Sequence, residues 1–139
     1  MSETQNTQIV KDAYAAFGRG DVNAILALLD ESVEWEGVKG AEGVAPHAGK
    51  RQGKAAVGEF FQQLGSTLDF QLFEPREFVA QGDSVVAIGR YKATVKATKK
   101  VTESDWVMVF NFRNSKVVRF REFTDSAAVV RAYGVPAGV

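Results

Sequence analysis

Hydrophobic residues recur at intervals of three and four in three stretches of the chain, which is the spacing of one face of a helix. These stretches predict helices over about residues 6–18, from residue 22 to near residue 30, and over residues 54–64. Asp21 is placed to cap the second of them. We expect the first two helices to pack against each other as a hairpin.

Beyond residue 65 the hydrophobic period becomes two, which is the period of a half-buried strand. A short strand with the same alternation is also predicted between the second and third helices. The predicted strands cover residues 32–36, 68–73, 78–80, 84–98, 101–113 and 116–124. The last three are long enough to form an antiparallel meander, and Ser126 can cap a final helical turn or two.

Residues 37–53 follow the first short strand and carry glycine at five positions as well as Pro46. This composition disfavours the interior of a helix or strand and predicts a long loop. Loops of this length are often functional. Helices followed by an antiparallel sheet indicate an α+β fold with the helices packed on one face of the sheet. We expect residues 1–139 to form a single domain.

Composition narrows the possible partners. The 139 residues are 45% apolar, enough for one domain with a real core, and 17 Lys+Arg balance 17 Asp+Glu. With this balance of charges, the protein lacks the positive electrostatic potential that binding to nucleic acid or to an anionic membrane normally needs. The absence of cysteine excludes disulfides and thiolate chemistry, and a single histidine excludes two-histidine metal motifs. The polar start and the lack of a long apolar run predict a cytoplasmic protein without a membrane span.

Four segments carry a resemblance to a known family. They read AAFGRGD at residues 15–21, GKAAVGEFF at 53–61, GDSVV at 82–86 and KVVRFREFTD at 116–125. With the order of the elements, they resemble the SnoaL-like and nuclear transport factor two-like superfamily, which includes ketosteroid isomerases and polyketide cyclases. The resemblance implies a cone-shaped α+β fold with three helices on a curved sheet, a hydrophobic cavity, a homodimer and chemistry without cofactor or metal.

Ketosteroid isomerases place a catalytic carboxylate at the end of the first strand, and the matching residue here is Glu36. Their oxyanion hole needs a phenol and a protonated carboxyl, but the matching positions carry Ala13 and Met108. Tyr14 is one residue away from the phenol position, which on a helix is a rotation of about 100° toward another face. The resemblance therefore does not imply classical ketosteroid isomerase chemistry.

Limonene-type epoxide hydrolases use two carboxylates bridged by an arginine. The arginine matches Arg90 and one carboxylate matches Glu122, but the other position carries Lys92. A lysine in that position breaks the acid and base pair that the mechanism needs. This activity is not expected either.

SnoaL-like cyclases use a carboxylate late in the chain as acid and base, and either Glu122 or Asp125 could serve here. Strand alternation puts Glu122 on one face with Phe120, and Asp125 on the other or in the cap of the last helix. His47, in the glycine-rich loop over the expected cavity mouth, is a third candidate because an ordinary histidine titrates near neutral pH. It could equally be an exposed loop residue.

Aromatic residues at several points of the pattern could line a pocket for a flat or polycyclic apolar ligand, or could be plain core. Arg90 belongs to the same set by resemblance, although strand alternation alone places it outside. The predicted ligand-binding residues are Tyr14, Phe17, Trp35, Phe60, Arg90, Trp106, Met108, Phe110 and Phe120.

These observations lead to two hypotheses. In the first, the protein binds an apolar or aromatic compound and performs cofactor-free isomerisation, cyclisation or dehydration. Glu36 and Glu122 are then the acid and base pair, with His47, Arg90 and Asp125 in support. In the second, the absence of the oxyanion donors makes the protein a non-catalytic ligand-binding or dimerising scaffold.

Overall fold

A computed structural model describes residues 2–134. Its helices are α1 (Glu3–Gly18), α2 (Val22–Leu26), α3 (Lys54–Thr67) and α4 (Ser126–Ala132). Its strands are β1 (Leu29–Gly37), β2 (Gly49–Gln52), β3 (Leu68–Gln81), β4 (Ser84–Val95), β5 (Val101–Arg113) and β6 (Lys116–Thr124). The bounds of β5 and β6 are those that the hydrophobic period predicts.

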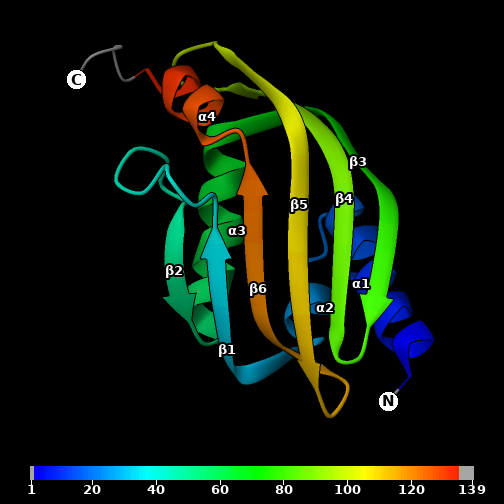
Figure 1. The fold of residues 1–139 in the computed structure, drawn as a ribbon. Coiled ribbons are helices and arrows are strands. Elements are labelled where there is room, and N and C mark those ends of the chain that lie inside the picture. Colours follow the sequence, from blue (N-terminus) through cyan, green and yellow to red (C-terminus); the bar gives the residue numbers. More distant parts are fainter. Residues whose placement is uncertain (1, 135–139) are drawn as a thin grey trace.

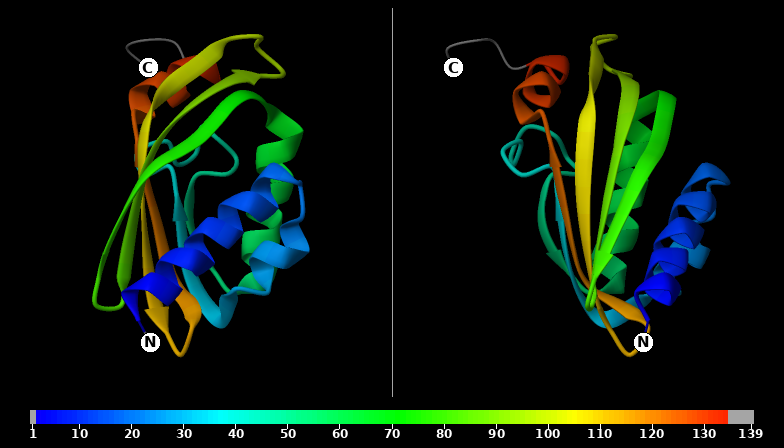
Figure 2. Two further views of the ribbon diagram at one scale, coloured as in Figure 1. Left: turned by 90° about the vertical axis from the view of Figure 1, so that its right-hand side faces the viewer. Right: turned by 45° about the vertical axis from the view of Figure 1, so that its right-hand side comes forward.

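The six strands form one curved, open sheet in the order β2-β1-β6-β5-β4-β3 (Figure 1). Neighbouring strands are antiparallel except for β1 and β6, which run parallel. Helices α1 and α3 cover the concave face, and α4 lies at the end of the sheet where β6 finishes (Figure 2). The structure therefore confirms the predicted α+β fold, with its helices on one side of a curved sheet.

The first helix starts three residues earlier than its hydrophobic stripe suggests. Ser2 and Gln5 form a capping box, in which each side chain accepts a hydrogen bond from the other residue's backbone N–H. Val10 and Ala16 are the buried apolar residues on the inner face of the helix. The pair Ser2 and Gln5 could have been recognised in the sequence as a capping box. The spacing of apolar residues missed it because both residues are polar.

Other elements also differ from the prediction, and three of the differences have a clear cause in strand pairing. The second helix ends at Leu26, because Leu29 already pairs with Val117 of β6. The glycine-rich segment contains strand β2, which pairs with the end of β1. Strand β3 is continuous through Pro75, with two irregularities in its register. These differences thus arise from pairing between strands. The local spacing of hydrophobic residues carries no information about such pairing.

The inner face of the sheet carries the main core and leaves room for large rings. Trp106 of β5 pairs with Gly89 of β4, and a Cβ at position 89 would collide with the indole ring and with the Glu74 carbonyl oxygen. A smaller apolar cluster packs the loop after β1 against α4, through Val38, Ala41, Ala45 and Val129. This cluster fixes the loop that closes one end of the concave side.

No helix within residues 2–134 is long and apolar enough to cross a membrane. The same residues contain no group of three or more His, Asp or Glu side chains arranged to hold a metal ion. The cytoplasmic location and the single-domain organisation of the whole chain stay predictions.

Candidate functional site

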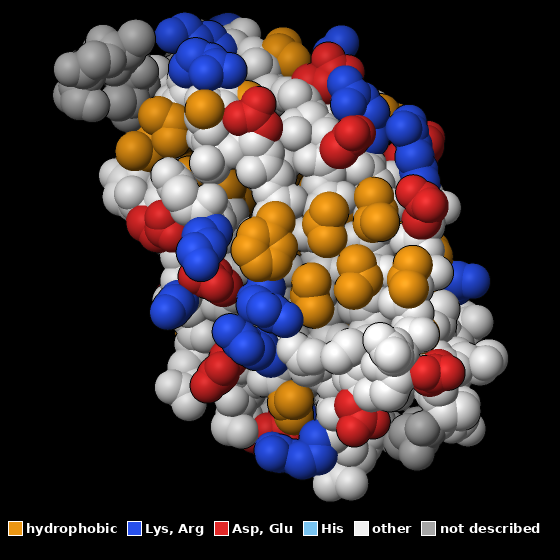
Figure 3. All heavy atoms as spheres, in the orientation of Figure 1, with side chains coloured by type: hydrophobic (Ala, Val, Ile, Leu, Met, Phe, Trp, Pro, Cys, Tyr) orange, Lys and Arg blue, Asp and Glu red, His pale blue; other side chains and the backbone are white. Residues whose placement is uncertain are grey.

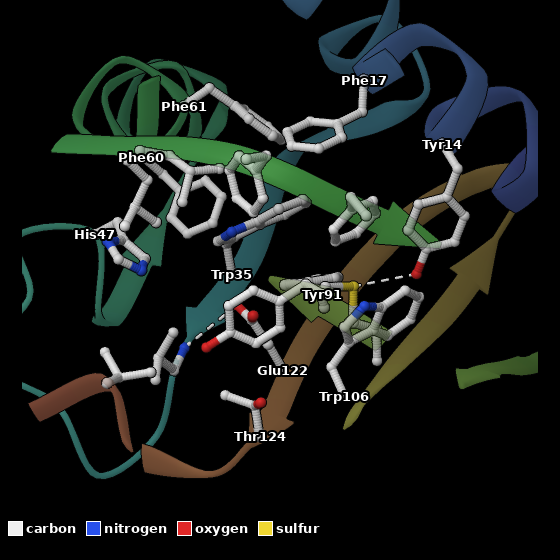
Figure 4. Close-up of a pocket in the computed structure, with 18 of the residues that line it drawn as sticks. Tyr14, Phe17, Trp35, His47, Phe60, Phe61, Tyr91, Trp106, Glu122 and Thr124 are labelled. Atoms are coloured by element: carbon white, nitrogen blue, oxygen red, sulfur yellow. Dashed lines mark hydrogen bonds between the residues drawn. The ribbon is translucent and has the colours of Figure 1, made fainter. Parts of the chain in front are cut away.

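A cavity of about 90 Å³ lies between the concave face of the sheet and the helices. Its wall is formed mainly by aromatic rings (Figure 4). The apolar residues predicted to contact a ligand all line it, namely Tyr14, Phe17, Trp35, Phe60, Trp106, Met108, Phe110 and Phe120. Of the four predicted catalytic residues, Glu122 and His47 line it as well.

Glu122 projects from β6 into this apolar surrounding. Its Oε1 accepts a hydrogen bond of 3.4 Å from the backbone N–H of Val38, in the loop after β1. Although the residue as a whole is only partly buried, its carboxyl group is enclosed, and this burial raises the pKa of Glu122 to about 7. No ion pair to Glu122 forms within the described part of the chain. The carboxyl can therefore either hold or release a proton near neutral pH.

Tyr14 supplies a hydroxyl group close to this carboxyl. Its Oη donates to the Sδ of Met108 over 3.1 Å, and Met108 pairs directly with Glu122 across β5 and β6. Burial, together with the negative charge of Glu122, raises the pKa of Tyr14 above its usual range. Because a thioether is a weak acceptor, a ligand oxygen could replace it. Ala13 and Tyr14 both line the cavity, so the expected change of face between them is wrong.

Two further tyrosines line the cavity without having been predicted. Tyr91 Oη and Thr102 Oγ1 form a hydrogen bond of 2.8 Å, and burial raises the pKa of Tyr91. Tyr133 Oη forms a hydrogen bond of 2.8 Å with Thr67 Oγ1. The inward alternation of Tyr91 with Ala93 was visible in the sequence. Tyr133 follows Val129 at helical spacing at the end of the last helix, but this spacing does not show that its hydroxyl reaches the cavity.

His47 is buried at the end of the cavity farthest from Tyr14 (Figure 4). Its Nδ1 lies 3.4 Å from Tyr133 Oη, and the neighbouring Pro46 carbonyl accepts a hydrogen bond of 2.9 Å from Arg51 Nη2. Burial, and then the positive charge of Arg51, lowers the pKa of His47 to about 4. The histidine is thus a neutral wall residue at pH 7 and not an exposed loop residue.

The placement of Glu36 corrects an expectation. Val33, Trp35 and Gly37 of β1 are buried on the inner face, so Glu36 alternates outward. With Lys50 and Arg119 it lines a separate polar pocket on the outer side, and it does not line the aromatic cavity. The acid and base pair of Glu36 and Glu122 therefore does not exist as predicted, because the sheet separates the two side chains.

Asp125 and Arg90 are also absent from the cavity wall. Asp125 caps α4, where its Oδ1 accepts a hydrogen bond of 3.1 Å from the Ala128 N–H. Arg90 forms ion pairs with Asp105 at 3.1 Å and Glu103 at 3.3 Å on the outer face. Strand alternation gave the correct side for Arg90, and the position implied by resemblance was wrong.

Comparison with known proteins identifies the family. A SnoaL-like domain family matches residues 10–120 of the chain. No curated protein matches it. An NTF2-like protein from Burkholderia xenovorans LB400 is 40% identical, with a TM-score of 0.86, and the match covers 96% of this chain and 99% of that chain.

Two other crystal structures are similar along nearly the whole chain. An NTF2-like protein from Burkholderia thailandensis E264 is 30% identical with a TM-score of 0.84, covering 97% of this chain and 100% of that one. TerC, co-crystallised with polyporic acid, is 25% identical with a TM-score of 0.80, covering 94% of this chain and 99% of that one. The family match and the similarity of sequence and fold show that the chain belongs to the SnoaL-like domain family of NTF2-like proteins.

Proposed function

We propose that this protein is a small-molecule enzyme that performs cofactor-free acid/base chemistry on a neutral ring compound with a carbonyl group. Glu122 takes and returns the proton. The observation that carries the proposal is the carboxyl of Glu122 in an aromatic cavity, where burial raises its pKa to about 7. A general base with a pKa near the working pH combines a useful ionised fraction with basicity sufficient for proton transfer.

In the proposed step the ionised Glu122 removes a proton from the carbon next to the carbonyl. The electron pair of the broken C–H bond forms a C=C bond, and the carbonyl π electrons move to oxygen to give an enolate. Tyr14, which burial keeps protonated, lines the same cavity and donates to a weak thioether acceptor, so its hydroxyl can donate to the enolate oxygen instead. Return of the proton to another carbon gives isomerisation. In cyclisation the enolate carbon bonds to a second carbonyl carbon, the π electrons of that carbonyl move to its oxygen, and the alkoxide takes the proton from Glu122.

The cavity also restricts the size and charge of the substrate. Its volume of about 90 Å³ lies below the roughly 300 Å³ at the lower end of typical ligand pockets, which favours one ring over several. Its described wall includes no Lys or Arg, so an anionic ligand would lack a counter-charge. TerC, the relative crystallised with polyporic acid, supports ligand binding by this fold.

Exchange of hydrogen for deuterium tests the proposal without knowledge of the natural substrate. The protein is incubated in D₂O with a panel of monocyclic aryl ketones that starts with acetophenone, and exchange is followed by proton NMR. We expect catalysed exchange that increases as the pH rises through about 7. Glu122→Gln should lower the rate ~100-fold or more. The matched control Glu36→Gln, on the outer face, should leave it unchanged.

The proposal fails if Glu122→Gln exchanges these ketones as fast as the wild type, or if no ketone of the panel exchanges. The second outcome, combined with measurable binding, would favour the non-catalytic carrier. One observation points that way, because the hydroxyl of each tyrosine in the cavity wall is already bonded. Tyr91 and Tyr133 are bonded to Thr102 and Thr67, and Tyr14 donates to the sulfur of Met108, which is the weakest of these partners.

We also propose that the protein forms a homodimer through the outer face of the sheet. An apolar patch lies at the centre of this face (Figure 3). Two cross-strand rows build it. One consists of Phe123, Val107 and Ile88, and the other consists of Val109, Val86 and Val79. Val79 is 57% exposed and Phe123 38%, so that covering the patch would remove a contiguous apolar area from water.

A further inference from the structure

Two buried indole N–H groups in the cavity wall have no hydrogen-bond partner. Trp35 is 5% exposed and Trp106 1% exposed, and the Nε1 atom of each is unpartnered within residues 2–134. Both residues line the cavity. A buried donor without an acceptor is costly, and buried tryptophan normally bonds its N–H. Two such donors in one cavity indicate acceptors that the protein does not itself supply.

The register of the sheet places the two indoles on opposite sides of Glu122. Along β6, Glu122 stands between Phe120 and Thr124 on the inner face, at a spacing of two residues on either side. Phe120 pairs with Trp35 of β1, and Thr124 pairs with Trp106 of β5. By this register Glu122 lies diagonally between the two tryptophans. Figure 4 shows the two indole rings at separate places in the cavity wall, so we expect a separate acceptor for each N–H.

Aromatic stacking fixes the plane of each indole. Trp35 stacks on Phe120 with ring centroids 3.9 Å apart and an interplanar angle of 19°. Trp106 stacks on Phe73 with centroids 5.1 Å apart and an angle of 10°. Because the rings are held in these planes, the directions of the N–H bonds are set before a ligand enters, which lowers the cost of binding.

We propose that the indole N–H groups of Trp35 and Trp106 recognise two carbonyl oxygens on opposite sides of one ligand. The ligand class is then an uncharged ring compound with two carbonyl groups, such as an aryl diketone. This assignment deepens the proposed function and rests on it. Trp106 and Trp35 become residues that select the substrate, in addition to the proton transfer at Glu122.

The surroundings of Trp106 add a role for one of the two carbonyls. The rings of Tyr14 and Trp106 have centroids 5.5 Å apart, so a phenol O–H and an indole N–H lie at the same end of the cavity. Two donors at one oxygen stabilise an enolate better than one. The carbonyl at this end is therefore the one that Glu122 activates, and the carbonyl near Trp35 orients the ring.

The inference can be tested by NMR because the chain has only two tryptophans. A proton–nitrogen spectrum of the labelled protein shows two indole signals, which the Trp35→Phe and Trp106→Phe variants assign. The probes are para-diacetylbenzene with two carbonyls, acetophenone with one, and para-diethylbenzene with none. Because a bound aromatic ring shifts nearby protons by its ring current, the complex with para-diethylbenzene is the reference. Relative to it, we expect para-diacetylbenzene to move both indole protons downfield and acetophenone to move one.

Affinity gives a second readout. The dissociation constant of para-diacetylbenzene should be several-fold lower than that of para-diethylbenzene, and each Trp→Phe variant should lose about fivefold of this preference. Equal affinities, absence of binding, or binding of para-diacetylbenzene without movement of both indole signals would overturn the inference. These measurements need no turnover, so their failure is separate from that of the exchange assay. The wild-type spectrum alone decides the case if a variant does not fold.

Discussion

Met108 and Glu122 face each other across β5 and β6, and the Met108 sulfur accepts the hydroxyl of Tyr14 over 3.1 Å. A proton-accepting carboxyl and a proton-donating phenol are thereby brought to neighbouring positions by one cross-strand pair and one hydrogen bond. Their electrostatic coupling is visible in the negative charge of Glu122, which contributes to the raised pKa of Tyr14. Because the two groups are coupled, a mutation at Glu122 should also alter the pKa of Tyr14.

Replacing the phenol should slow the chemistry and replacing the sulfur should not. Tyr14→Phe removes the donor to the enolate oxygen, and we expect a decrease of ~10- to 100-fold in ketone exchange, somewhat less than the loss of an oxyanion-hole donor. Met108→Leu conserves volume and should cost less than about 1.5 kcal/mol in stability while keeping most of the exchange activity. Exchange rates measured by NMR compare the two variants. Equal losses would contradict a donor role for Tyr14.

Glu122 should make the protein less stable as the pH rises. Its pKa is about 7 in the folded state and 4.5 when unperturbed, so the folded state binds more protons between these values. The stability that Glu122 contributes is therefore greatest near and below pH 4.5 and decreases toward pH 7, by at most about 3 kcal/mol. Urea unfolding of the wild type and of Glu122→Gln at pH 5 and pH 8 measures this contribution as the difference between the two proteins. A difference that is the same at both pH values would refute the assignment.

His47 should have the opposite effect on stability, which it should lower as the pH falls below about 6.5. Its pKa is about 4 in the folded state against 6.5 when unperturbed, so the unfolded state binds more protons between these values. Stability contributed by the neutral histidine is present above pH 6.5 and is lost as the pH falls toward 4. We expect His47→Gln to flatten this acid limb in unfolding titrations carried out in the Glu122→Gln background. An unchanged acid limb would show that His47 is not held neutral by its surroundings.

Glycine at position 89 should be required for stability. Gly89→Ala forces a Cβ against Trp106 and the Glu74 carbonyl, and we expect a loss of about 1–3 kcal/mol or more. The matched control is Gly65→Ala in α3, where a Cβ meets no other atom within 4 Å and helix propensity favours alanine by up to about 1 kcal/mol. Thermal unfolding should therefore shift in opposite directions in the two variants. A shift in the same direction would contradict the packing at position 89.

The proposed dimer should dissociate when its centre is charged. Val107 lies in the middle of the outer apolar patch, between Phe123 and Ile88. Val107→Asp buries a carboxylate in the interface and should convert a dimer to a monomer in light scattering coupled to gel filtration. Val101→Asp is the control, because Val101 is 52% exposed on the same strand but outside the patch. A monomeric wild-type protein would end this proposal.

Periodicity predicted the local structure well and the pairing poorly. The alternation of β5 and β6 gives their bounds because a strand with one buried face shows its register in every second residue. Strand β2 escaped prediction because Gly49–Gln52 has no apolar alternation and exists only through pairing with β1. The parallel pairing of β1 with β6 joins segments more than 80 residues apart along the chain, as in the pair Trp35 and Phe120, which no local pattern contains.

The same distinction explains the outcome for the site. Alternation alone puts Glu122 inside and Glu36 outside, since Glu36 follows the inward Trp35 and Glu122 shares its face with the inward Phe120. The position implied by resemblance overrode this rule for Glu36 and Arg90, and in both cases the strand geometry prevailed. The pKa values of Glu122 and His47 depend on burial by distant elements, which the sequence does not reveal.

The contact between Gly89 and Trp106 also predicts how these two positions vary among homologous sequences. A bulky ring at position 106 forbids a side chain at position 89, so the two positions cannot vary independently during evolution. In homologues, loss of the glycine should accompany a smaller residue at the facing position, and with it the loss of the indole donor. This pair of positions therefore offers a marker for sorting uncharacterised homologues into those that carry the indole-lined cavity and those that have rebuilt it.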